Sequence, residues 1–253
     1  MFAVLCFALL VPVSAFADVT INEANFPDAN FRNWLLEQDY GQDGVITTKE
    51  IAEITEIDVS YMEISSLKGI EYFAALTGLD CSNNQLTRLD VTNNTALRWL
   101  YCNDNQLTRL DVSKNTALWE LWCRDNQLTN LNVSGCTALS WLSCENNQLT
   151  RLDVTKNTAL NGLDCSNNQL TSLDVSKNTA LESLYCGNNQ ISGENMNKLI
   201  SSLPNTEGTV VILISNSETE GNVCTTEQVA AIKAKGWIPR YYNGEEYVEY
   251  SGE

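Results

Sequence analysis

The chain has 253 residues, a formal net charge of −17 and no histidine. A surface this acidic repels phosphate backbones and anionic lipid headgroups, so we expect no nucleic acid as a partner. The lack of histidine excludes Ser-His-Asp and Cys-His catalysis and removes the commonest zinc ligand, so we expect a protein that is not an enzyme.

The first segment of the chain is apolar and carries no charge. Residues 1–17, MFAVLCFALLVPVSAFA, end in small residues around Ala15 and Ala17, which is typical of a secretory signal peptide cleaved before Asp18. A membrane anchor is the alternative interpretation, although the segment is short for a membrane span. The segment therefore predicts a secreted or cell-surface protein with no membrane insertion after signal removal.

Residues 18–75 are expected to form a helical, EF-hand-like N-terminal cap followed by a first coil. Phe31, Trp34 and Leu35 recur at helical spacing, which predicts a helix whose apolar side faces a core. A short second helix is expected after the loop DYGQDGVITTKE. Trp34 is interpreted as a core residue and not as a binding residue.

The loop in this cap resembles a calcium-binding loop. It matches the EF-hand template at Asp39, Asp43, Thr47 and Glu50. It departs from the template at the third ligand position, where Gly41 offers no side-chain oxygen. Two interpretations stay open: a calcium site, and a helix–loop–helix that is purely structural. No other cofactor is expected.

Residues 76–190 repeat with a period of 21 residues, and each coil reads L-x-x-L-x-C-x-x-N-x-L-x-x-L-D-V-x-x-N-x-A. Cysteine recurs at Cys81, Cys102, Cys123, Cys144, Cys165 and Cys186. This pattern is that of a leucine-rich repeat of short period. We expect an α/β solenoid in which the first half of each coil contributes a strand to a parallel, concave sheet. Each coil can bury its leucines only against its neighbours.

Two residue types recur at inward positions of the coil. The asparagines at Asn84, Asn105, Asn126, Asn147, Asn168 and Asn189 are expected to bond turn amides and carbonyls that have no other partner. The repeated cysteines are expected to be inert free thiols in the core, because neighbouring parallel strands do not favour disulfides and the spacing is not that of a zinc site. Cys136 and Cys224 lie outside this ladder.

Aromatic and charged residues gather at the outward positions of the first half-coil. Alternation along a strand places Trp99, Tyr101, Glu120, Trp122, Arg124, Trp141 and Glu145 on the concave face. Such a group is typical of a protein-binding hot spot or a platform on which sugars stack. The alternative is that the rings only stabilise the sheet. The end coils carry Gly, Asp or Ser at the same places, which favours binding because they are expected to fold without aromatics.

The second half-coil carries repeated opposite charges two residues apart. The pairs are Arg88 and Asp90, Arg109 and Asp111, and Arg151 and Asp153. We expect these side chains to form ion pairs along one face. In the third coil both members change together, to Asn130 and Asn132, which favours pairing with each other over contact with a ligand.

Residues 191–253 are expected to form a βα C-terminal cap. The pattern predicts a helix over GENMNKLISSLP, a buried strand over GTVVILIS and a second helix over TTEQVAAIKAKG. Thr225 and Gln228 form a capping-box pattern at the start of that second helix. Two final strands flank the turn at Asn243 and Gly244, and Trp237 is expected in the core.

The repeat and the segments INEANFPDANF and GIEYFAALTGL resemble the internalins, specifically their branch with cysteine-bearing 21-residue repeats. The resemblance implies a secreted or surface protein of a bacterium, which binds a protein or glycan of a host or neighbouring cell. It also implies a cap that has an EF-hand-like shape and is often free of metal.

Three functional hypotheses follow. The first is a non-catalytic, adhesin-like binding protein that is monomeric and uses its concave face. The second is a structural surface protein that assembles with copies of itself. The third, an acidic hydrolase with paired carboxylates such as Asp80 and Asp104, is disfavoured because acids scattered along open turns imply no pocket.

Overall fold

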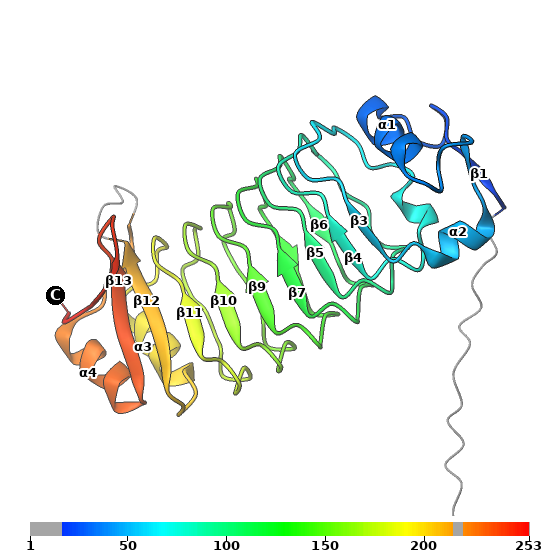
Figure 1. Ribbon diagram of the computed structural model, residues 1–253. Coiled ribbons are helices and arrows are strands. Elements are labelled where there is room, and N and C mark those ends of the chain that lie inside the picture. Colours follow the sequence, from blue (N-terminus) through cyan, green and yellow to red (C-terminus); the bar gives the residue numbers. More distant parts are fainter. Residues whose placement is uncertain (1–16, 215–219, 253) are drawn as a thin grey trace, which may run out of the picture.

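The computed structural model describes residues 17–214 and 220–252. The chain forms an elongated solenoid in which thin coils stack in a row between two caps (Figure 1). Within the described ranges no helix is long and apolar enough to cross a membrane. The predicted signal peptide lies outside the described residues, apart from Ala17.

One ten-stranded sheet, the main sheet, runs the length of the molecule. Its repeat strands are β3 (Glu56–Asp58), β4 (Gly78–Asp80), β5 (Trp99–Tyr101), β7 (Glu120–Trp122), β9 (Trp141–Ser143), β10 (Gly162–Asp164) and β11 (Ser183–Tyr185), all parallel. Leu79, Leu100 and Leu121 are Cα partners across successive strands. Because the repeat period is constant, equivalent residues pair with each other, and the predicted leucine-rich-repeat solenoid with a parallel sheet is confirmed.

A second, much smaller sheet lies on the other half of the coils. It contains only β6 (Leu110–Asp111) and β8 (Leu131–Asn132), which are parallel. An isolated bridge joins Asp90 to Asp111. The second half-coil is therefore mostly extended chain that is held by its turns.

The core is a continuous column of leucine, valine and cysteine side chains. The six ladder cysteines are fully buried, and Cys136 and Cys224 are buried as well. All eight cysteines of the described part of the chain are free thiols. Burial raises the pKa of the Cys102 and Cys123 thiols well above the usual range, and the preceding thiol on the ladder adds to this effect in both. The prediction of unreactive core thiols agrees with this geometry.

The predicted asparagine ladder is confirmed as a set of hydrogen bonds between coils. Asn105 Nδ2 donates to the carbonyl oxygens of Cys81 and Cys102, at 3.0 and 3.2 Å. Asn105 Oδ1 accepts from the backbone N–H of Leu86 at 2.9 Å. In each coil the side chain thus satisfies backbone groups of its own turn and of the preceding coil.

A second asparagine column lies on the far side of the core. It consists of Asn94, Asn115, Asn157 and Asn178, all fully buried. Asn115 Nδ2 donates to the carbonyl oxygens of Val91 and Asn94, at 3.0 and 2.8 Å. The third coil has Cys136 at this place, and its Sγ lies 3.4 Å from the Val112 carbonyl oxygen. Cys136 therefore replaces an asparagine of the column.

The N-terminal cap covers the first end of the core. Its elements are the strands β1 (Val19–Thr20) and β2 (Val45–Ile46), the helices α1 (Ala29–Glu37) and α2 (Thr48–Glu53), and the 3-10 helix η1 (Ile70–Tyr72). Asp28 accepts from the N–H groups of Asn30 and Phe31 and so caps α1. The same carboxylate accepts from Ser65, which ties the cap to the first coil. Trp34 packs against the core but is only partly buried.

The C-terminal cap extends the main sheet. Its elements are α3 (Gly193–Ser202), β12 (Gly208–Ile214), α4 (Thr226–Ala234), β13 (Trp237–Tyr242) and β14 (Tyr247–Glu249). β12 and β13 continue the parallel sheet, and β14 closes it as an antiparallel hairpin. The predicted capping box of Thr225 and Gln228 is present. Trp237 is buried, as expected, and donates from Nε1 to the Pro204 carbonyl oxygen.

Candidate ligand-binding face

The predicted aromatic and charged residues lie together on the outer face of the main sheet. We call this group the sheet-face patch; it comprises Trp99, Tyr101, Glu120, Trp122, Arg124, Trp141 and Glu145. Glu120 is the Cα partner of Trp99 on one side and of Trp141 on the other. Tyr101 is the partner of Trp122 in the next row. Because residues 21 apart in sequence are partners on neighbouring strands, the patch residues of β5, β7 and β9 lie in two adjacent rows across the sheet.

The aromatic rings of the patch contact one another. The Tyr101 ring centroid lies 5.1 Å from that of Trp99 and 4.9 Å from that of Trp122. Both pairs are tilted, with interplanar angles of 37° and 36°. Trp119, which is 46% exposed, precedes β7 and lies outside these rows. The aromatic core of the patch is thus a three-ring group on two neighbouring strands.

The glycines on the flanking strands have a packing role. A Cβ atom on Gly78 would lie 2.0 Å from Cζ2 of Trp99, and one on Gly162 would lie 2.1 Å from Cζ3 of Trp141. The two indoles therefore lie over the glycines of their neighbouring coils. The strands β4 and β10 form without aromatic residues, as expected, and their glycines leave space for the adjacent tryptophan.

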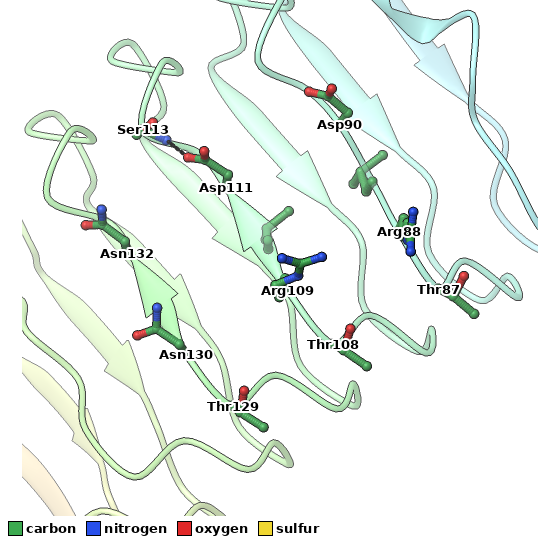
Figure 2. A pocket seen from close by; sticks show the side chains of 12 residues that line it. Thr87, Arg88, Asp90, Thr108, Arg109, Asp111, Ser113, Thr129, Asn130 and Asn132 are labelled. Carbon is green, nitrogen blue, oxygen red and sulfur yellow. Dashed lines mark hydrogen bonds between the residues drawn. The ribbon is translucent and has the colours of Figure 1, made fainter.

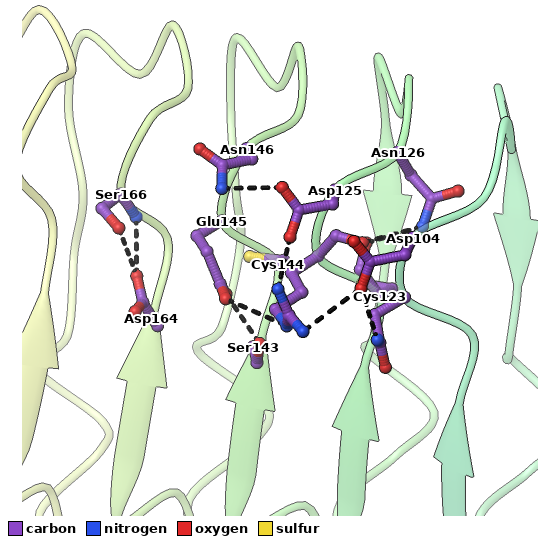
Figure 3. Close-up of polar contacts among 12 residues, drawn as sticks. Asp104, Cys123, Asp125, Asn126, Ser143, Cys144, Glu145, Asn146, Asp164 and Ser166 are labelled. Atoms are coloured by element: carbon purple, nitrogen blue, oxygen red, sulfur yellow. Dashed lines mark hydrogen bonds and ion pairs between the residues drawn. The ribbon is translucent and has the colours of Figure 1, made fainter. Parts of the chain in front are cut away.

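Charged side chains form a network at the end of the strands (Figure 3). Arg124 makes three ion pairs: at 3.2 Å with Asp104, at 2.6 Å with Asp125 and at 3.8 Å with Glu145. Ser143 Oγ donates to Glu145 Oε2 at 2.6 Å. Arg124 and Glu145 of the patch are thus joined to each other, and Arg124 is fully engaged by carboxylates of three coils.

Partial burial shifts the protonation equilibria of this face. Desolvation, together with the nearby Asp164 carboxylate, raises the pKa of Glu145 to about 7, although Ser143 and Arg124 act in the opposite direction. The pKa of Asp164 is also raised, mainly by desolvation. Desolvation and the Glu120 carboxylate raise the pKa of Tyr101 to about 12. Glu145 and Asp164 are therefore less hydrated than fully exposed carboxylates.

The structure adds residues that the sequence pattern did not single out. Asp164 lies on β10 in the same row as Tyr101 and Trp122, and Tyr185 follows it on β11. Tyr247 reaches this row from the closing hairpin, with its ring centroid 5.7 Å from that of Tyr185. Asp164 and Tyr185 occupied outward places of the repeat, so alternation identified their direction. Tyr247 belongs to no repeat and gave no such signal.

The predicted ion pairs of the second half-coil are not formed. Among the described residues, Arg88, Arg109 and Arg151 have no carboxylate within ion-pair distance, and the aspartates accept hydrogen bonds from their own turns. Asp111 Oδ1 accepts from the Ser113 N–H at 2.9 Å (Figure 2). Asn132 Oδ1 accepts from the Ser134 N–H in the same way, at 3.1 Å. The expectation was wrong because a turn needs only an acceptor oxygen there, which aspartate and asparagine both supply.

A shallow groove of about 590 Å³ follows this second face. It is lined by Thr87, Arg88, Asp90, Thr108, Arg109, Asp111, Thr129, Asn130 and Asn132, among others (Figure 2). The groove spans three coils and contains both signs of charge. It has none of the aromatic surface of the main sheet.

The calcium-loop residues have structural partners. Thr47 caps α2, and Glu50 Oε2 accepts from the Thr47 N–H at 2.8 Å. Asp43 Oδ1 accepts from the Val45 N–H at 3.0 Å, and Asp39 Oδ1 lies 3.5 Å from Gln42 Nε2. Over residues 17–214 and 220–252, no group of three or more His, Cys, Asp or Glu side chains is placed to hold a metal. Calcium binding by this loop stays a prediction.

The hydrolase hypothesis rests on carboxylates that the structure engages otherwise. Asp104 is ion-paired with Arg124. Asp80 Oδ1 accepts from the N–H and Oγ of Ser82, at 2.9 and 2.6 Å. Both acids are therefore held by neighbouring side chains or turns.

Comparison with known proteins identifies the repeat and the fold. Residues 158–205 match the family model for leucine-rich repeats in two copies. No curated protein sequence matches the chain.

Several solved structures are similar to this chain. A leucine-rich-repeat protein of Leptospira interrogans is 22% identical, with a TM-score of 0.62 over 76% of this chain and 50% of its own length. Internalin C2 from Listeria monocytogenes is 22% identical, with a TM-score of 0.52 over 72% of this chain and 94% of its own. The functional domain of InlJ from Listeria monocytogenes, described as including a cysteine ladder, is 24% identical, with a TM-score of 0.37 over 90% and 62% of the two chains.

These likenesses concern architecture. The chain spans 62% of the InlJ domain and 50% of the Leptospira protein. At these identities they bear on the fold alone, and the resemblance to internalin-type proteins is confirmed at that level. The chain is a leucine-rich-repeat solenoid of the fold found in internalin C2.

Proposed function

We propose that this protein is a non-catalytic, adhesin-like binding module that acts outside the cell and recognises a ligand through the sheet-face patch. The observation that carries the proposal is the contact group of Trp99, Tyr101 and Trp122, whose rings are only partly buried on the outer face of the sheet. Rigid aromatic side chains provide large contact areas at low cost in conformational entropy, which is why they dominate binding hot spots.

Two further features support the proposal. Solenoids of stacked repeats present extended surfaces on which outward residues vary while inward ones stay fixed. The apolar segment at residues 1–17 and the fold shared with internalin C2 favour a secreted or surface-exposed bacterial protein, and its partner would be a protein or glycan of a host or neighbouring cell.

The test is capture of ligands on an array of host proteins and glycans by the chain beginning at Asp18. Changing Trp99, Trp122 and Trp141 together to Ala is expected to abolish capture, because all three indoles leave the face. Trp122→Ala alone is the second variant, since it leaves the two indoles that pack on glycines in place. Arg109→Ala, in the groove of the second half-coil, is the matched control and is expected to capture as the unchanged protein does.

Each variant is first compared by its circular dichroism spectrum and melting temperature. Undiminished capture by a folded Trp122→Ala variant and by the triple variant would refute the proposal. Equal loss in Arg109→Ala would place the binding surface elsewhere.

A further inference from the structure

The outer face of the main sheet carries a strong excess of negative charge. Its carboxylates include Asp58, Asp80, Asp104, Glu120, Asp125, Glu145 and Asp164, and its cations include Arg124 and Arg240, which is in register with Tyr185 through Val211. Arg124 is already engaged by Asp104, Asp125 and Glu145. In the described part of the chain, Asp80, Glu120 and Asp164 have no cation within ion-pair distance.

Glu120 lies between two strands that carry aromatic residues. Its Cα partners are Trp99 and Trp141, and these indoles lean away from it, over Gly78 and Gly162. The carboxylate lies next to the Tyr101 phenol, whose pKa it helps to raise. The half-buried Glu120 side chain thus lies beside the Tyr101 phenol and between the strands that carry Trp99 and Trp141, and no cation of the described residues is within ion-pair distance of it.

Asp164 has a similar setting at the other end of the face. Tyr185 is its neighbour in the row, and Tyr247 contacts Tyr185. The pKa of Tyr247 is raised by partial burial and by the Asp164 carboxylate. Tyr247 is 46% exposed, so this second aromatic group is open to solvent. Acidic and aromatic side chains therefore both occur along this face, from β4 to the closing hairpin.

This combination matches one class of ligand. The faces of aromatic rings attract cations, and the attraction strengthens as the contact is removed from water. Carboxylates without a cation add a complementary charge, and the overall charge of −17 attracts a basic partner from a distance. Phosphorylated, sulfated or sialylated ligands would instead meet an unfavourable potential.

We propose that the outer face of the main sheet binds a protein segment rich in lysine and arginine, with cationic side chains lying against the rings beside Glu120 and Asp164. The proposal rests on the function proposed above and assigns a chemical class to its ligand. The segment would run along the solenoid, because the two acid–aromatic groups lie on different coils of one face.

The test uses a synthetic peptide of alternating lysine and glycine as the probe, with binding to the mature chain measured by isothermal titration calorimetry. The same peptide with every lysine acetylated keeps the length and loses the charge. The lysine peptide is expected to bind more weakly as salt rises, and the acetylated peptide at least tenfold more weakly than the lysine peptide at low salt.

Variants distinguish binding at the proposed face from attraction of the peptide by the overall negative charge of the protein. Glu120→Gln combined with Asp164→Asn is expected to lower the affinity for the lysine peptide about tenfold, and Trp122→Ala by a similar factor. The matched control is Asp90→Asn combined with Asp111→Asn. It removes the same charge from the opposite side of the coils, and Asn132 already fills the equivalent place in the third coil. We expect this control to stay within about twofold of the unchanged protein.

Three outcomes would overturn the proposal: equal binding of the acetylated peptide, no binding of the lysine peptide at low salt, or equal loss of affinity in the two double variants. These failures are distinct from failure of the proposed function. If the array ligand depends on Trp122 but the lysine peptide does not bind, the face is a binding site for another class of ligand. If the tryptophan variants capture the array ligand normally, both proposals fall.

Discussion

At the scale of single residues, each ladder cysteine lies in the continuous hydrophobic core of the solenoid. Cys102 and Cys123 are fully buried, and burial keeps their thiols protonated by raising the pKa. We expect the native protein to be unreactive toward a thiol reagent at pH 8 and all eight described cysteines to react after unfolding in urea. Rapid labelling of the folded protein would contradict the burial.

The asparagine ladder predicts a large loss of stability on truncation. Asn126 donates to Cys102, Cys123 and Arg124 carbonyl oxygens and accepts from the Leu107 N–H. Asn126→Ala leaves several buried backbone groups without partners and is expected to lower the free energy of unfolding by about 3 kcal/mol or more. Urea denaturation measures this, and the exposed Asn130→Ala serves as control, with a change within about 0.5 kcal/mol.

Glu145 predicts how stability depends on pH. Burial raises its pKa to about 7 from an ordinary value of 4.5, so the folded state holds the proton more tightly than the unfolded state. The contribution of Glu145 to stability is therefore full below pH 4.5 and is lost as the pH rises to about 7. Asp164 acts in the same direction, and Arg124 opposes the shift.

Glu145→Gln should flatten this dependence and be more stable than the unchanged protein above pH 7. Melting temperatures across pH 5 to 8 give the comparison. Desolvation opposes the shift at Asp28, but hydrogen bonds lower its pKa from the ordinary value of 3.8, so its contribution to stability is present above that value and is lost only as the pH falls below it, outside this window. If the melting temperature changes with pH equally in both proteins, Glu145 is not the group that causes the pH dependence.

The direction of each residue in the repeat was predictable, whereas its side-chain partners were not. Period and alternation alone placed Trp99, Trp122 and Trp141 outward. They could not show that two of these indoles lie over Gly78 and Gly162, because a ring's tilt depends on the space that the adjacent coil leaves. The Arg124 ion pairs likewise join three coils and depend on side-chain rotamers.

At the scale of elements, the start of helix α2 shows how one sequence pattern fits two interpretations, a calcium loop and a helix cap. Thr47 and Glu50 match calcium-ligand places, and the structure joins them as a reciprocal capping box. We expect Thr47→Ala to lower the free energy of unfolding by about 1 kcal/mol through loss of the cap. Melting curves with calcium and with a chelator complete the test. If these residues act only as a helix cap, Thr47→Ala lowers the melting temperature equally with calcium and with the chelator. If calcium raises the melting temperature of the unchanged protein and Glu50→Gln removes that increase, the loop binds the ion.

Helices and strands were more predictable than the contacts between their charged residues. The capping box at Thr225 and the hydrophobic runs of the C-terminal cap predicted α4, β12 and β13 from local signals. The prediction for the second half-coil was wrong. An aspartate two residues from an arginine suggests an ion pair, but the same aspartate can instead accept a hydrogen bond from its own turn, as Asp111 does. Local pattern determines an element, while the choice between two polar partners depends on geometry in three dimensions.

At the scale of the whole molecule, the ends of the main sheet predict a monomer. The N-terminal cap covers the first coil, and the other edge is the three-residue strand β14, where Glu249 is ion-paired with Lys233 at 2.7 Å. Short, charged edge strands disfavour pairing with another chain. Light scattering over a concentration series is expected to give the monomer mass throughout. A mass that rises with concentration would favour the self-assembling surface protein.

The hydrogen bonds between coils run along the long axis of the solenoid, because each coil pairs with the next through the main sheet and both asparagine columns. Tension applied between the two ends therefore loads these bonds in series. The coils would peel off one after another, each releasing 21 residues, or roughly 70 Å of extended chain. A partner bound across several coils would stabilise those coils against unfolding. Under tension the coils outside the binding face would therefore unfold first, before the partner dissociates.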